Sequence, residues 1–262
     1  MKRKLIVIAF IICSYLLFPL YVYGNVTINT EKSFQGLVQI QYTGDLSKQV
    51  KVMVEANGDK NVYNIRNNDP GYVPLQMGAG TYKISVLQQI EGTKFKPLIS
   101  ESIEVDNVDI FKMFTSPCLI VDFNSTMKAI QGYSDLSNNQ SKNDTIQSMY
   151  KEMVTKYSYD FDKIKNLPND YVPVIDEMYM SKKGICYDYS VMLASLLRYN
   201  GIPAKLVMGY APNIKEYHAW NEIFIDGQWV AVDTTYDSQY EKAKQDYTFA
   251  KDSSKRKVVK VY

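Results

Sequence analysis

Histidine is nearly absent from this chain, which has 262 residues and a single histidine, His218. A site that needs several imidazole ligands is therefore excluded, and a reaction that needs an imidazole base must use His218. Cysteine is scarce too. Cys13 lies in the N-terminal apolar run, which leaves Cys118 and Cys186 in the rest of the chain. We interpret Cys118 as a small buried hydrophobic residue at the start of a strand over 120–123, so Cys186 is the candidate for thiol chemistry.

The chain also lacks a large excess of charge of either sign. Its formal net charge is +2, from 30 basic and 28 acidic residues. This balance argues against nucleic-acid binding by bulk charge. Lys255, Arg256, Lys257 and Lys260 form a basic cluster near the C-terminus, which we interpret as a solvated edge rather than a partner site. No calcium-binding loop is visible, and the N-terminal half has no carboxylate cluster with metal-ligand spacing. We expect no metal and no other cofactor.

Residues 1–24 have the pattern of an export signal peptide. Basic residues at positions 2–4 precede an apolar run over 5–23, and Gly24 ends a segment that resembles a cleavage site. The run is close to the length that spans a bilayer, so an uncleaved N-terminal anchor is the alternative. In both cases we expect the remainder of the protein to be secreted or extracytoplasmic.

Residues 25–107 are predicted to form an N-terminal β-sandwich of the immunoglobulin-like type. About seven short segments alternate apolar and polar residues with a period of two, and turn residues such as Asn57-Gly58 separate them. No histidine or cysteine occurs in this stretch. We expect a spacer or a binding module, which could contact a partner in the cell envelope.

Residues 108–262 show a change to helical periodicity, which predicts an α+β protein overall. A polar loop over 138–143 precedes a helix that we expect Asn143 or Asp144 to cap. The apolar stripe of this helix consists of Ile146, Met149, Tyr150, Met153, Val154 and Tyr157, which is the spacing of one buried face. A shorter helix is predicted over 175–180.

Cys186 is predicted to lie in the first turn of the next helix. That helix ends near Tyr199, because Gly201 suits a left-handed cap and Pro203 follows. Unpaired N–H groups and the helix dipole would stabilise a thiolate at Cys186, and the same N–H groups could face an oxyanion. Gly184 would let a substrate backbone come close.

His218 is predicted to begin a β-hairpin whose strands are 218–225 and 228–233, joined by the turn Asp226-Gly227. Pairing of residues 225 and 228 would place Trp220 opposite Asp233, and His218 opposite Thr235. His218 and Asp233 would then be diagonal neighbours on one face, roughly 7–8 Å apart at the backbone. Asp233 could orient the imidazole, and Trp220 would shield it from water.

Two other carboxylates, Asp188 and Glu222, lie near these residues in the sequence. We expect both to point away from the imidazole. The order thiol, imidazole, carboxylate within 48 residues suits a catalytic triad, because a thiol nucleophile needs a base and the base needs an orienting group.

Five short segments occur in a specific order and spacing: GICYDY over 184–189, GIPA over 201–204, GY over 209–210, HAWNE over 218–222 and WVAVDTTY over 229–236. With these segments, about residues 112–250 resemble the transglutaminase-like superfamily of papain-like thiol enzymes. The resemblance implies a fold of helices and an antiparallel sheet.

The same resemblance implies Cys186 as nucleophile, His218 as base and Asp233 as its orienting group. Family members commonly have Asp-Pro where this chain has Asp233-Thr234, which leaves the triad intact. A second oxyanion donor, which usually comes from an upstream side chain, is not assigned.

The sequence therefore predicts an exported thiol enzyme that acts on a peptide or protein substrate. It would catalyse hydrolysis or acyl transfer at peptide or carboxamide bonds through a thioester. One alternative is a catalytically silent cell-surface binding protein that uses its β-sandwich. Another is a disulfide between Cys118 and Cys186, which would remove the nucleophile.

Overall fold

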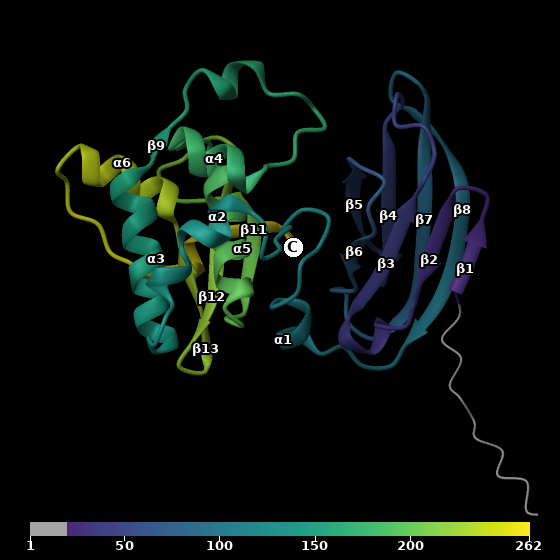
Figure 1. Cartoon of the computed structure of the whole chain (residues 1–262), viewed down its shortest axis with the longest axis horizontal. Coiled ribbons are helices and arrows are strands. Elements are labelled where there is room, and N and C mark those ends of the chain that lie inside the picture. Colours follow the sequence, from purple (N-terminus) through teal and green to yellow (C-terminus); the bar gives the residue numbers. More distant parts are fainter. Residues whose placement is uncertain (1–19) are drawn as a thin grey trace, which may run out of the picture.

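The computed structural model describes residues 20–262, which form two parts that lie side by side (Figure 1). The predicted signal peptide lies mostly outside the described residues. Its last segment, Leu20–Tyr23, forms strand β1, an exposed edge strand that pairs antiparallel with β2 (Val26–Asn29). Within the described residues, no helix is long and apolar enough to cross a membrane.

The N-terminal part contains two antiparallel sheets of four strands each, with the orders β1-β2-β3-β6 and β5-β4-β7-β8. The two sheets are the two layers on the right of Figure 1, and their buried side chains belong to one core. The other strands are β3 (Leu37–Tyr42), β4 (Val50–Ala56), β5 (Asp59–Ile65), β6 (Gly71–Pro74), β7 (Gly80–Glu91) and β8 (Lys94–Val105).

The predicted alternation explains these strands. In β4, Val50, Val52 and Val54 face the core and are at most 1% exposed, while the residues between them are half-buried. Asn57 and Gly58 both have positive φ values, 53° and 84°, as a tight hairpin turn requires. Two strands, β1 and β6, were not expected, because one lies in the predicted leader and the other directly follows Pro70.

The C-terminal part combines helices with an antiparallel sheet of order β13-β12-β11-β14. Its helices are α1 (Ile110–Met113), α2 (Lys128–Gly132), α3 (Lys142–Lys156), α4 (Ile175–Ser181), α5 (Cys186–Tyr199) and α6 (Thr234–Lys242). Its strands are β9 (Ser158–Tyr159), β10 (Lys183–Gly184), β11 (Ala204–Tyr210), β12 (His218–Ile225), β13 (Gln228–Val232) and β14 (Lys257–Val261). The short 3-10 helices of both parts are Ser33–Gln35, Ser134–Leu136, Lys163–Asn166 and Ser253–Lys255.

Two local predictions in this part are wrong. Residues 120–123 form no strand, because Cys118 and Val121 are joined in a tight turn by a 2.9 Å backbone hydrogen bond. Helix α3 begins earlier than expected, since the side chain of Ser141 accepts a hydrogen bond from the Asp144 N–H at 3.1 Å. The apolar stripe of α3 is confirmed as buried.

Helix α5 is the central helix of the C-terminal part. Every residue from Asp188 to Arg198 is buried, because α3, α4, α6 and the strands β11 and β12 all pack against α5. The helix ends as predicted: Gly201 has a φ of 67° in the left-handed region.

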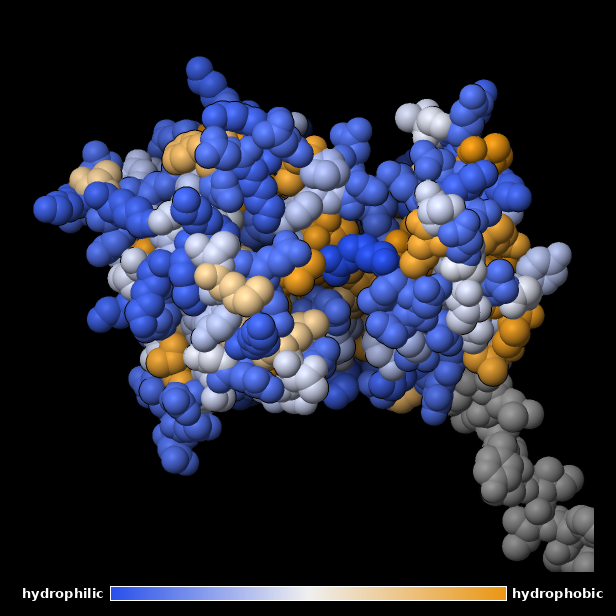
Figure 2. All heavy atoms as spheres, turned by 45° about the horizontal axis from the view of Figure 1, so that its top comes forward, coloured by the Kyte–Doolittle hydropathy of each residue, from blue (hydrophilic) through white to orange (hydrophobic). Residues whose placement is uncertain are grey.

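The two parts share a continuous hydrophobic core. Tyr63 of β5 and Tyr262 contact each other edge to face, with ring centroids 5.5 Å apart. Arg66 donates a 3.1 Å hydrogen bond to the carbonyl of Val172. On the face shown in Figure 2, hydrophilic residues cover most of the surface, and hydrophobic residues are visible where the two parts meet. The N-terminal sheets are therefore packed against the C-terminal part rather than only tethered to it.

Candidate active site

Cys186 is the first residue of α5, as predicted, and Ile185 is its N-cap. The cap is held by Asp188, whose Oδ2 accepts the Ile185 N–H at 2.8 Å. The other oxygen of Asp188 accepts from Lys163 Nζ at 2.9 Å and from the Tyr171 hydroxyl. Asp188 is 1% exposed, so this buried carboxylate fixes the start of the helix. Cys186 itself is only partly buried. The first N–H groups of the helix lie beside it, and no preceding helical turn offers them a carbonyl acceptor.

Gly184 has a packing role in the structure. A Cβ atom at this position would lie 2.8 Å from the Cβ of Asp188 and 3.2 Å from the sulfur of Met178. The space beside Gly184 is thus filled by the protein's own side chains, which differs from the expected approach of a substrate backbone. The glycine is needed so that Asp188 can reach the helix cap.

His218 and Asp233 are in direct contact, as the hairpin register predicted. His218 Nε2 lies 2.9 Å from Asp233 Oδ2, and both side chains are buried. The turn and the pairing of Ile225 with Gln228 are confirmed. The returning strand ends at Val232 rather than Asp233, because Asp233 is the N-cap of α6 and its Oδ1 accepts the Tyr236 N–H at 3.1 Å.

This early end of β13 changes one detail of the prediction. Thr235 does not face His218 across a ladder, because it already belongs to α6. The contact with Asp233 places Nε2 of His218 toward the carboxylate and leaves Nδ1 as the nitrogen that can face a thiol.

Arg256 is the residue that sequence reasoning missed. The C-terminal basic cluster was interpreted as a solvated edge, but the side chain of Arg256 is only 6% exposed and its Nη1 lies 3.2 Å from Asp233 Oδ2. The correction applies to this residue, since Lys255 and Lys257 are exposed. The segment itself gave no signal of this, because β14 has the sequence Lys-Val-Val-Lys-Val without a regular alternation of apolar and polar residues.

The pKa values of the pair reflect these contacts. Burial, the largest influence, would lower the pKa of His218, but the charge and hydrogen bond of Asp233, followed by those of Cys186, raise it to about 10. Burial would raise the pKa of Asp233, but His218 and then Arg256 and the Tyr236 N–H hold it below its usual value. At neutral pH, His218 is therefore an imidazolium beside an ionised Asp233.

Trp220 covers the pair from one side. Its ring lies nearly parallel to the His218 ring, with centroids 6.4 Å apart and planes at 21°. The guanidinium carbon of Arg256 lies 5.0 Å from the centroid of the Trp220 ring. Trp220 is 1% exposed, which agrees with the expected shielding of the imidazole from water.

Other residues near the site have defined places. Burial, followed by the influence of Cys186, raises the pKa of Tyr159 to about 12, so a protonated hydroxyl lies in the neighbourhood of the thiol. Tyr159 pairs with Gly184 across the short β9–β10 bridge, a non-local contact that the sequence did not indicate. Glu222 points away from His218, as expected, and pairs with Lys205 at 2.9 Å.

Both cysteines in the described part of the chain are free thiols. Cys118 is buried, and Cys186 is partly accessible. The alternative of a Cys118–Cys186 disulfide is therefore wrong. Among residues 20–262, no group of three or more His, Cys, Asp or Glu side chains could hold a metal ion.

The family model of the transglutaminase-like superfamily matches residues 131–234. This segment includes Cys186, His218 and Asp233. The chain contains a domain of the transglutaminase-like superfamily. A search of curated proteins gave no match.

A search of solved structures matches transglutaminases and a protein described as a cysteine protease, all with low TM-scores. A TGase is 20% identical with a TM-score of 0.34, over 57% of this chain and 43% of that chain. Red sea bream transglutaminase is 10% identical with a TM-score of 0.31, over 76% of this chain and 47% of that chain. A candidate cysteine protease from Cytophaga hutchinsonii is 15% identical with a TM-score of 0.35, over 76% and 78% of the two chains. This chain thus spans less than half the length of these two transglutaminases.

The transglutaminase-like domain combines three elements that thiol chemistry requires. Helix α5 presents Cys186 at its N-terminus, β12 supplies His218, and the junction of β13 and α6 supplies Asp233. The superfamily consists generally of cysteine enzymes, and this arrangement is suited to a thiolate–imidazolium pair.

Proposed function

We propose that this protein is an exported thiol enzyme that cleaves or transfers acyl groups at peptide or carboxamide bonds through a thioester on Cys186. The observation that carries the proposal is the buried contact of the only histidine, His218, with Asp233, together with the position of Cys186 at the start of α5, from where it raises the pKa of His218. In this proposal Cys186 is the nucleophile, His218 the acid and base, and Asp233 its orienting group.

The reaction would begin with attack of the Cys186 thiolate on the carbonyl carbon of the substrate. The N–H groups at the start of α5 would stabilise the oxyanion of the tetrahedral intermediate. His218 would then give its proton to the leaving amine as the C–N bond breaks, which leaves a thioester. Water or a second amine, deprotonated by His218, would attack the thioester, and the thiolate would be released again.

The substrate class follows from this chemistry: a peptide or protein that presents an amide carbonyl. We propose export from the basic and apolar N-terminal pattern. Cleavage after Gly24 would remove β1, which pairs only at the edge with β2 and exposes Leu20, Val22 and Tyr23. We further propose that the remaining sheets form an immunoglobulin-like module that could bind a partner in the cell envelope.

The test is the rate of Cys186 alkylation by iodoacetamide as a function of pH, followed by peptide mapping. A thiolate paired with imidazolium should react near neutral pH, and His218→Ala should slow the reaction at pH 6–7 by about tenfold or more. Cys118, which is buried, serves as an internal control in the same samples.

Substrate turnover completes the test. Peptides that contain glutamine would be incubated with and without a fluorescent primary amine, and ammonia release and amine incorporation would be measured. Cys186→Ala should abolish both products. A Cys186 thiol that reacts slowly and is indifferent to His218 would refute the proposal and favour a silent binding protein.

A further inference from the structure

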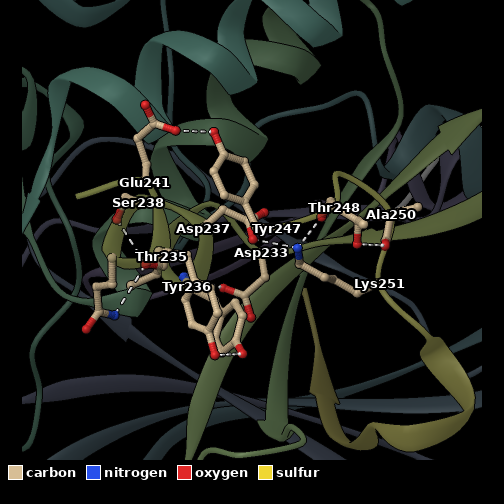
Figure 3. Close-up of polar contacts among 12 residues, drawn as sticks. Asp233, Thr235, Tyr236, Asp237, Ser238, Glu241, Tyr247, Thr248, Ala250 and Lys251 are labelled. Carbon is tan, nitrogen blue, oxygen red and sulfur yellow. Dashed lines mark hydrogen bonds and ion pairs between the residues drawn. The ribbon is translucent and has the colours of Figure 1, made fainter. Parts of the chain in front are cut away.

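The segment between α6 and β14, residues 243–256, is fastened to the transglutaminase-like domain by Lys251; we call it the C-terminal strap. Lys251 Nζ lies 2.5 Å from Asp237 Oδ1, and its backbone N–H donates to the Ala231 carbonyl at 2.8 Å. Figure 3 shows Lys251 reaching Asp237 of α6 and the carbonyl of Thr248. Asp237 is fully buried, so the strap has a fixed attachment before it enters β14.

Strand β14 brings the end of the strap to the site. It pairs antiparallel with β11, and Gly209 of β11 pairs with His218 on one side and with Val258 on the other. A Cβ atom on Gly209 would lie 2.0 Å from the Lys257 carbonyl oxygen and 3.1 Å from the Trp220 ring. The missing side chain at Gly209 therefore permits the close approach of β14 to the histidine strand.

Arg256, directly before β14, shares one oxygen atom with the imidazole. Asp233 Oδ2 lies 3.2 Å from Arg256 Nη1 and 2.9 Å from His218 Nε2. The guanidinium also packs over Trp220, which in turn covers His218. The side chain of Arg256 is only 6% exposed. Because it contacts the same carboxylate oxygen, its guanidinium competes with the imidazolium of His218 for the negative charge of Asp233.

We propose that Arg256 is a positioning residue of this site: it holds the carboxylate of Asp233 and limits how strongly that carboxylate retains the proton of His218. The inference rests on the proposed function, in which His218 must both keep and release a proton. An imidazolium held by Asp233 alone would be a weaker acid toward the leaving amine.

The charged and titratable groups around the pair come from several elements. Asp233 interacts with Asp237 and Tyr236 of α6 and with Tyr150 of α3, besides His218 and Arg256. His218 interacts with Asp233 and Cys186. Asp237 is itself paired with Lys251. Among residues 20–262, Arg256 and the imidazolium of His218 are thus the two cations that contact Asp233.

The test uses the fact that His218 is the only histidine, so its imidazole gives a single set of NMR signals in protein carrying a histidine-free tag. The titration would be made in the Cys186→Ala background. Removing Cys186 takes away its raising influence, so the His218 pKa falls below about 10 and the titration comes within the range of folded protein. Arg256→Gln should then raise the midpoint by about one pH unit, because a cation that opposed protonation is lost.

Lys255→Gln is the matched control. It removes the same charge one residue away, but Lys255 is exposed and pairs with Asp252. Its His218 midpoint should stay within about 0.2 pH unit of the parent, because solvent screens that charge. Equal shifts in the two variants, or no shift in Arg256→Gln, would overturn the proposal.

Arg256→Lys keeps the positive charge and should hold the midpoint within about 0.3 pH unit of the parent. If Arg256→Gln does not fold, this variant decides, since a shift of a full unit despite the retained charge would refute the electrostatic role. The outcome is separable from the proposed function. If Arg256→Gln shifts the His218 midpoint but the protein shows no substrate turnover, the inference about Arg256 is supported and only the proposed enzymatic activity is refuted.

Discussion

The buried carboxylate of Asp237 should make the protein more stable at mildly acidic pH than at neutral pH. Burial is the largest influence on this group and raises its pKa from 3.8 to about 6, although Lys251 and Tyr150 oppose the rise. An acid with a raised pKa binds more protons in the folded state than in the unfolded state between these two values. Stability therefore falls as pH rises through this window. A shift of about two units at 1.36 kcal/mol per unit corresponds to roughly 3 kcal/mol.

The perturbation is Asp237→Asn, which cannot titrate. Urea unfolding at pH 4, 5, 6 and 7 gives the free energy of unfolding for both proteins. Between pH 7 and pH 4 the wild type should gain up to about 3 kcal/mol relative to the variant, most of it between pH 6 and pH 4. Using the difference removes the contributions of carboxylates that do not interact with Asp237. Asp233 interacts with Asp237 and is only partly cancelled, and its lowered pKa acts in the opposite direction.

Asp246→Asn provides the control, because it removes one negative charge from an exposed position in the same strap. Its difference from the wild type should stay nearly flat with pH. A difference between wild type and Asp237→Asn that changes by less than about 0.5 kcal/mol over this range would refute the reasoning, since it would mean that the fold imposes no net cost on the ionised carboxylate.

Two further substitutions test the packing beneath the site. Arg198→Met should lower the free energy of unfolding by about 3 kcal/mol in urea titrations, because Arg198 is buried and donates to three backbone carbonyls that would lose their donor; an unchanged midpoint would contradict this. Gly184→Ala should lower the free energy of unfolding by about 1–3 kcal/mol, because the new Cβ would lie 2.8 Å from the Cβ of Asp188. The alkylation of Cys186 should also become slower. A wild-type stability together with a wild-type alkylation rate would show that Asp188 moves aside freely.

Features set by local chemistry could be predicted from the sequence. The Asp226-Gly227 turn defines the register of the hairpin, and this register brings His218 to Asp233. The start of α5 at Cys186 and its left-handed end at Gly201 also follow from nearby residues.

Features that depend on partners far away in the sequence could not be predicted in this way. Arg256 is part of a locally polar, basic segment, and its burial arises only because β14 pairs with β11, far back in the sequence. The segment over 120–123, with three apolar residues of four, has the composition of a strand, yet it lies in an irregular turn in which Ile120 and Val121 are buried and Asp122 is exposed. Tyr159 approaches Cys186 through a two-residue bridge that has no sequence pattern.

The continuous core between the two parts has a consequence for how the protein melts. Buried residues of the N-terminal sheets and of α5 belong to one cluster, so the predicted boundary at residue 107 does not separate two independent cooperative units. Heating should then unfold both parts in one calorimetric transition. A molecule that binds only the folded N-terminal sheets would raise the melting temperature of the distant helix that carries Cys186, by mass action alone.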